Sequence, residues 1–224
     1  QLHRSMAALP LVIVGALLMG GQGEAAEAVR LASVRLERPV IELYERCELT
    51  IQLAGDVLNP YDLDELTLEA TFQPARGRPV TVYGFYYQPF EQVTTPRGGQ
   101  TIQPAGDPVW KVRFTPTRTG RWAYHVRVLH HGREVDGPSG AVEVSPSARN
   151  GFLRLDRATG SLRFDRGGTF VPIGENLAWA PSAQLLESYD HWFQELSRQR
   201  ANYIRVWLAP WSLRLETKDT GVGR

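Results

Sequence analysis

Cysteine is nearly absent from this 224-residue chain, in which Cys47 is the single example. One cysteine excludes an intrachain disulfide, so the fold must be stabilised by its core. Cys47 lies in a strand-like stretch, where we expect a half-buried small side chain. The chain also lacks a cluster of basic residues, and its formal net charge is only +1. This balance argues against nucleic acid or an anionic membrane surface as the main partner.

The apolar run from Ala7 to Met19 is shorter than the about 20 residues that a membrane-spanning helix needs. It follows the positively charged Arg4 and precedes small residues at Ala26 and Ala28. This order is typical of a secretory signal. We therefore predict that residues 1–28 are a signal peptide cleaved after Ala28, which makes the mature protein secreted or periplasmic and leaves it no membrane partner. An uncleaved membrane anchor is the alternative.

With 42% apolar and 22% charged residues, the chain can form a substantial core. Short stretches that alternate apolar and polar residues extend from residue 29 to about residue 145, with Pro, Gly, Asn and Asp between them. Seven or so strands at this spacing predict an antiparallel, immunoglobulin-like β-sandwich over residues 29–145. The stretches are VRLASVRLE, PVIELYERCELTIQLAG, LTLEATFQP, PVTVYGFYY, VWKVRFTP, RWAYHVRVLHHG and GAVEVS.

The clearest local element is the hairpin FTPTRTGRWAYHVRV. In its second half Trp122, Tyr124, Val126 and Val128 recur at every other position, which predicts one buried face. Both aromatic side chains are interpreted as core residues rather than as ligand platforms.

A polar linker at residues 146–151 precedes the last region, residues 152–224. A short hairpin there leads into a strand–helix–strand pattern, FVPIGENLAWAP, SYDHWFQELSRQRA and NYIRVWLAPW. We expect Ser182 or Ser188 to cap the helix and Asn202 to end it in the left-handed conformation. Strand–helix–strand crossovers build parallel sheets. The pattern predicts the first β/α units of a (β/α)8 TIM barrel that the chain does not complete, and hence a multidomain fold class.

Arg205 is the most telling residue of the second strand. Strand alternation places Tyr203, Arg205 and Trp207 on one side and an apolar set on the other. An arginine that points into a sheet interior is costly unless carboxylates pair with it. Arg205 therefore predicts acidic partners, and carboxylate pairs are how most glycosidases work. The alternative is that Arg205 lies near the strand end and extends into solvent.

Three segments resemble exported glycoside hydrolases that carry an N-terminal β-sandwich of the DUF5060 type before a cellulase-like (β/α)8 barrel. WKVRFTPTRTGRWAYHVRV resembles the sandwich signature, and FVPIGENLAW and NYIRVWLAPW resemble the first two barrel strands. The resemblance implies a polysaccharide or oligosaccharide substrate, cleaved with retention. It also implies that Arg205 hydrogen-bonds the nucleophilic glutamate. The chain departs from the family at Ala201, where glycine is usual.

We predict that substrate-binding residues lie at the ends of these two strands: Glu175, Asn176, Trp179, Trp207 and Trp211. Asn176 can bond a sugar hydroxyl, and the tryptophans can stack on a pyranose face, although packing within the fold is the alternative for each tryptophan. The resemblance places the catalytic glutamates after later strands, beyond residue 224. The chain is therefore expected to be inactive as the N-terminal part of a secreted glycoside hydrolase. The competing hypothesis is a non-catalytic exported β-sandwich module that binds carbohydrate or protein.

Neither a metal nor another cofactor is expected. His130 and His131 are adjacent, and adjacent strand residues point to opposite faces, so a shared metal ion is disfavoured. His125 and His191 have no ligand partner at motif spacing. Phosphate-binding loops and nucleophile motifs are absent from the sequence.

Overall fold

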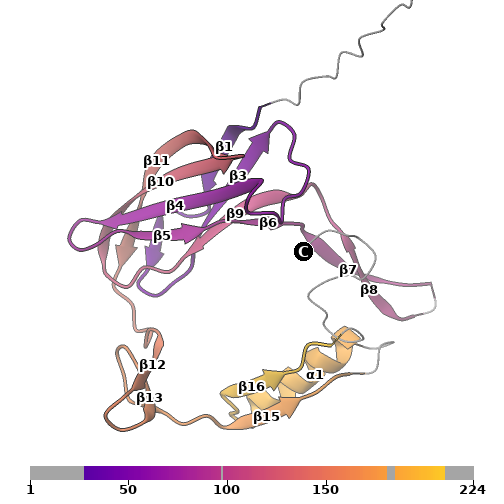
Figure 1. The fold of residues 1–224 in the computed structure, drawn as a ribbon. Helices are drawn as coiled ribbons and strands as arrows, with labels where there is room; N and C mark the ends of the chain where they lie inside the picture. Colours follow the sequence, from indigo (N-terminus) through magenta and orange to yellow (C-terminus); the bar gives the residue numbers. More distant parts are fainter. Residues whose placement is uncertain (1–27, 97, 181–184, 210–224) are drawn as a thin grey trace, which may run out of the picture.

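The computed structural model describes residues 28–96, 98–180 and 185–209 (Figure 1). The predicted signal peptide, apart from Ala28, lies outside these residues, as do Ser182 and Trp211. Within the described part of the chain, no helix combines the length and the hydropathy needed to span a bilayer.

Residues 30–145 form two main β-sheets. The four-stranded sheet has the order β1 (Arg30–Leu36), β3 (Cys47–Ala54), β9 (Val109–Phe114) and β6 (Phe85–Tyr87), all antiparallel. The five-stranded sheet has the order β2 (Val40–Glu42), β11 (Arg133–Ser145), β10 (Gly120–His130), β4 (Leu66–Pro74) and β5 (Val80–Tyr83). Its pairs are antiparallel except β2 with β11, which is parallel.

One apolar core lies between these sheets, and aromatic rings from both sheets meet in it. Phe72 of β4 stacks on Phe114 of β9 with ring centroids 4.1 Å apart, and Trp122 of β10 lies 5.0 Å from Phe114. The predicted face of β10 is confirmed, because Trp122, Tyr124, Val126 and Val128 are all buried. Burial of these alternating side chains is the main contribution that stabilises the two-sheet region.

Two polar groups of β3 are buried beside this core. Cys47 is 1% exposed, so the half-buried position expected from the sequence is wrong, and burial raises the pKa of its thiol to about 11. The carboxylate of Glu48 accepts hydrogen bonds from Lys111 and from Arg113 Nε (2.7 Å) on the neighbouring strand β9. A buried carboxylate needs such partners, because burial without them is costly.

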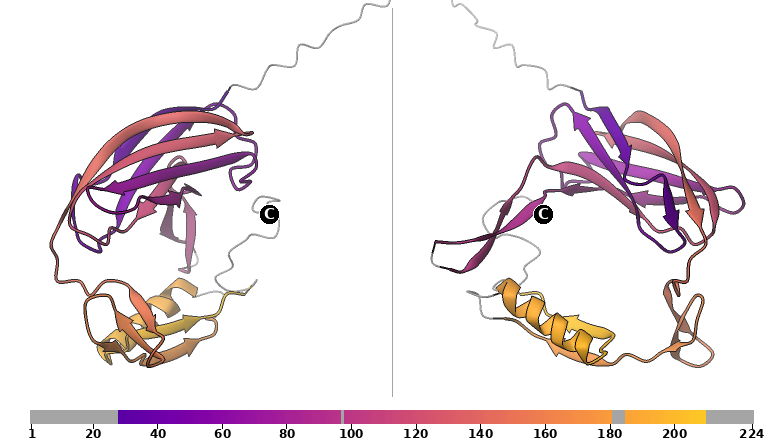
Figure 2. Two further views of the ribbon diagram at one scale, coloured as in Figure 1. Left: turned by 60° about the vertical axis from the view of Figure 1, so that its left-hand side comes forward. Right: turned by 180° about the vertical axis from the view of Figure 1, so that it is seen from behind.

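A hairpin of β7 (Phe90–Thr94) and β8 (Gln100–Pro104) extends from the two sheets toward the helix α1 (Leu185–Arg198) (Figures 1 and 2). Beyond residue 145, the chain forms the antiparallel sheet β12 (Leu153–Asp156), β13 (Ser161–Phe164) and β14 (Thr169–Phe170). The short hairpin predicted in this part is confirmed.

The predicted strand–helix–strand unit is present as β15 (Gly174–Leu177), α1 (Leu185–Arg198) and β16 (Tyr203–Val206), and its two strands pair in parallel. The helix ends differ from the prediction. Ser188 lies inside α1 and caps nothing, and the positive φ of 61° after the helix belongs to Arg200 rather than Asn202. Asn202 instead joins the strands, since its side chain accepts a hydrogen bond from Ile173 N and donates one to Val171 O.

The predicted fold class, a sandwich followed by the start of a (β/α)8 barrel, is wrong because no barrel start forms. Within the described residues α1 is the only helix, and β15 and β16 pair only with each other. Three of the four positions in each of these strands are exposed, whereas barrel strands are covered on both faces. Local periodicity predicted the crossover correctly, but a single crossover cannot specify the closure of a barrel.

Candidate functional site

Four of the predicted site residues meet at the carboxyl ends of β15 and β16. Asn176 and Arg205 are direct partners in the parallel register. The Trp179 and Trp207 rings lie edge to face, with centroids 5.9 Å apart. The Arg205 guanidinium carbon is 5.7 Å from the centre of the Trp207 ring, within the range of a cation–π contact. We refer to Asn176, Trp179, Arg205 and Trp207 as the tryptophan site.

The backbone around the tryptophan site is held by close contact between the two strands. A Cβ atom added at Gly174 would lie 1.6 Å from the carbonyl oxygen of Tyr203, so β15 can approach β16 this closely only with glycine there. Trp207 N donates a hydrogen bond to Leu177 O at 3.0 Å, which continues the pairing beyond the strand end. Each tryptophan thus follows a strand whose position is fixed by its partner.

The helix covers the opposite face of these strands. Leu177 lines one hollow with Trp192 and Leu196 of α1, and Ile204 lines a second with Phe193. By strand alternation Asn176 and Arg205 therefore lie on the open face. Glu175 lies on the same side as Leu177, so the structure separates its side chain from the tryptophan site, although Glu175 is exposed.

The surroundings of Arg205 differ from those expected from the sequence. It is exposed, and no ion pair joins it to another residue of the described ranges. The expected carboxylate partners are thus not found among those residues, and the solvent-exposed alternative matches what is observed. Trp179 and Trp207 are 47% and 44% exposed, so each residue keeps almost half of its surface in contact with solvent.

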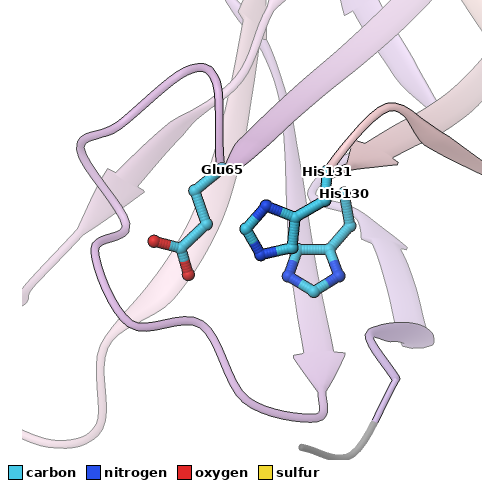
Figure 3. A group of neighbouring side chains, drawn as sticks. All are labelled: Glu65, His130 and His131. Carbon is cyan, nitrogen blue, oxygen red and sulfur yellow. The ribbon is translucent and has the colours of Figure 1, made fainter.

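A second group of side chains, which the sequence interpretation dismissed, lies at one end of the two-sheet region. Figure 3 shows Glu65, His130 and His131 side by side, with one ligand atom of each within 4.8 Å of the others. The premise that the two histidines point to opposite faces is wrong, because β10 ends at His130 and His131 has a positive φ of 48°. The HHG sequence, a histidine pair directly before a turn glycine, is the signal that could have revealed this.

Comparison with protein families assigns part of the two-sheet region. Residues 40–128 match the family model described as "Domain of unknown function (DUF5060)". These residues are therefore similar to DUF5060 domains. The match extends from β2 into β10 and therefore includes WKVRFTPTRTGRWAYHVRV, the motif on which the resemblance of the sandwich rested. A search of curated proteins found no match to the chain.

Comparison with solved structures adds one informative likeness. "Crystal structure of a putative glycoside hydrolase from Bacteroides vulgatus ATCC 8482" has a TM-score of 0.54 and 19% identity, and the match covers 75% of this chain. The chain corresponds to 28% of the length of that protein. At this identity the likeness concerns the fold alone and not the activity.

Two other solved structures were matched with TM-scores too low to support an argument. They are the Pseudomonas fluorescens alkylpurine DNA glycosylase AlkC (0.31, 18% identity, 52% of this chain and 30% of that one) and the CARDB domain of the Pyrococcus furiosus PF1109 protein (0.29, 10% identity, 54% and 90%).

Proposed function

We propose that this DUF5060 protein is part of a secreted glycoside hydrolase and that the tryptophan site binds its polysaccharide or oligosaccharide substrate. The observation that carries the proposal is the pair of half-exposed indoles at Trp179 and Trp207 beside Arg205 and Asn176. The fold likeness to the Bacteroides vulgatus protein supports the choice of a carbohydrate-related role.

The chemistry of the tryptophan site suits a sugar. The C–H face of a pyranose is apolar and packs on an indole face, while its hydroxyl groups need hydrogen-bond partners around the edge. The Asn176 amide both donates and accepts hydrogen bonds, and the Arg205 guanidinium donates them. Because Arg205 is already held near Trp207, little side-chain order has to be gained on binding.

Direct binding measurements test this proposal. Cello-, xylo- and manno-oligosaccharides are titrated into the protein, and binding is followed by isothermal titration calorimetry and by tryptophan fluorescence. We expect at least one series to bind, and Trp179→Ala and Trp207→Ala each to weaken it by about tenfold or more, as for aromatic residues that dominate other interfaces.

Tyr83→Ala is the matched control, because Tyr83 is an exposed aromatic residue (66%) on strand β5 of the two-sheet region. It should leave the affinity unchanged. The proposal fails if none of the oligosaccharides binds, or if both tryptophan variants bind as tightly as the unchanged protein.

The second candidate function, a module that binds another protein, is favoured by a different observation. Large apolar side chains are exposed on the chain between β14 and β15, among them Val171 (61%) and Ile173 (60%). Contiguous exposed apolar surface is typical of protein contacts. Oligosaccharide binding separates the two functions. If the tryptophan site binds the sugar, substitution of its tryptophans weakens oligosaccharide binding, whereas Val171→Ser leaves that binding unchanged.

A further inference from the structure

The side chains of Glu65, His130 and His131 gather beside a surface hollow of ≈ 680 Å³ at one end of the two-sheet region (Figure 3). The hollow lies between the β3–β4 connection and the β10–β11 turn. Its charged lining residues are Asp56, Glu65 and Arg133. It is remote in sequence from the tryptophan site and shares no residue with it.

The strand pattern explains why both imidazoles face the hollow. His130 is the next residue in the inward series of β10 after Val126 and Val128, so its side chain lies at the edge of the core. His131 continues the pairing with β4 through its backbone, donating from N to Glu65 O at 2.9 Å. The positive φ of His131 turns its side chain back, and the two ring centroids are 4.4 Å apart.

Glu65 is held in place before any ligand binds. It is only 7% exposed, and its two carboxylate oxygens accept hydrogen bonds from the backbone amides of Leu58 and Asn59, the latter at 2.8 Å. A carboxylate has about four lone-pair positions, so both oxygens keep acceptor capacity. Backbone donors behind a ligating carboxylate are the outer contacts that orient metal ligands in proteins.

His130 carries an unused ligand atom. Its Nε2 is buried and has no hydrogen-bond partner in the described part of the chain. Buried polar atoms in folded proteins are nearly always paired, and an isolated exception therefore requires an explanation. A bound cation would supply the missing partner.

We propose that Glu65, His130 and His131 bind one divalent transition-metal ion, for which Zn²⁺ is the appropriate probe. Two imidazole nitrogens and one carboxylate oxygen form a common zinc ligand set that leaves a fourth position for water. Zn–N bonds of about 2.0–2.1 Å bring ligand atoms to about 3.3 Å from one another in a tetrahedral site. The ligand atoms of the three side chains already lie within 4.8 Å of one another, and His131 is exposed. The ion would then join the β3–β4 connection to the β10–β11 turn.

Calorimetric titration of Zn²⁺ into the tag-free, chelator-treated full chain tests the site, with Co²⁺ absorption as an independent report of the ligand geometry. We expect one ion per chain. Removal of a ligand should weaken binding by at least about tenfold, because loss of mere outer contacts already costs 10- to 100-fold.

Three variants and one control make the result specific. His131→Gly removes an imidazole and suits the positive φ, His130→Phe keeps the ring volume, and Glu65→Gln removes the carboxylate charge. His125→Ala is the control, because His125 bonds Ser139 and Asp136 instead. The proposal stands if the three variants lose affinity and the control does not. It is overturned if Zn²⁺ does not bind, or if His130→Phe and His131→Gly, both folded by circular dichroism, bind it undiminished.

Discussion

The two-sheet region and the segment after residue 145 differ most in how many of their apolar side chains are buried. All buried apolar residues of the described chain except Ala180 and Tyr189 lie between Val29 and Val144. Many large apolar side chains of the later segment are instead exposed, including both indoles of the tryptophan site. The first region is stabilised by its own core, while the second leaves much of its apolar surface exposed.

The largest expected effect comes from the centre of the core. Phe72→Ala should lower the free energy of unfolding by about 3–5 kcal/mol, because it removes the ring that stacks on Phe114 and leaves a cavity. Phe193→Ala in α1, where the ring is 39% exposed, should cost less than about 1 kcal/mol. Urea unfolding followed by circular dichroism compares the two. Equal losses of unfolding free energy in the two variants would show that the two regions do not differ in this way.

The buried ion group on β3 gives the next largest effect. Glu48→Gln leaves Lys111 and Arg113 without their shared carboxylate and should cost about 2 kcal/mol at neutral pH. Glu143→Gln is the control, because its ion pair with Arg121 is exposed and worth at most about 1 kcal/mol. Similar losses in the two variants would contradict the importance of burial here.

The same group makes stability depend on pH. Burial opposes ionisation of Glu48, but the hydrogen bonds and charges of Lys111 and Arg113 outweigh it, so the pKa of Glu48 is lowered in the folded protein. Its stabilising contribution is therefore complete above the unfolded-state pKa of about 4.3 and is lost as the pH falls through the folded-state value. Glu48→Gln should flatten this acid limb of the stability profile.

A smaller effect of opposite sign is expected at the edge of the core. His130→Phe should raise the free energy of unfolding of the metal-free protein by about 1 kcal/mol, because it removes a buried nitrogen that has no partner. His125→Phe should lower it, since His125 loses two hydrogen bonds. Thermal unfolding in the presence of a chelator measures both. A destabilised His130→Phe protein would show that Nε2 has a partner in solution.

The smallest change in stability is expected at the tryptophan site. Trp207→Ala should alter the free energy of unfolding by no more than about 0.5 kcal/mol, because the ring is 44% exposed. Trp122→Ala, in which the ring is 2% exposed, should cost about 3–5 kcal/mol in the same assay. If Trp207→Ala also unfolds the chain, its indole is a packing residue and not a ligand platform.

The local sequence pattern correctly predicted several individual elements. Alternation in β10 correctly predicted its buried face, and helical spacing after β15 correctly predicted α1 between two parallel strands. The barrel expectation failed because it required further strands on both sides of β15 and β16, and alternation within one strand contains no information on its neighbours. The role of Asn202 was mistaken for the same reason, since its partners Ile173 and Val171 belong to a distant segment.

Side-chain alternation and turn residues in the sequence were enough to show which side chains share a face, where turns interrupt the strands, and that Arg205 and the two tryptophans lie near the ends of the two strands of a crossover unit. The contacts that those faces make became known only from the folded chain. In the folded chain Phe72 stacks on Phe114 across the two sheets, and Arg205 is exposed. Glu65 lies beside His130 and His131. The physical reason is that a strand period of two residues specifies a direction for each side chain, whereas contacts depend on register, burial and single backbone angles such as φ at His131.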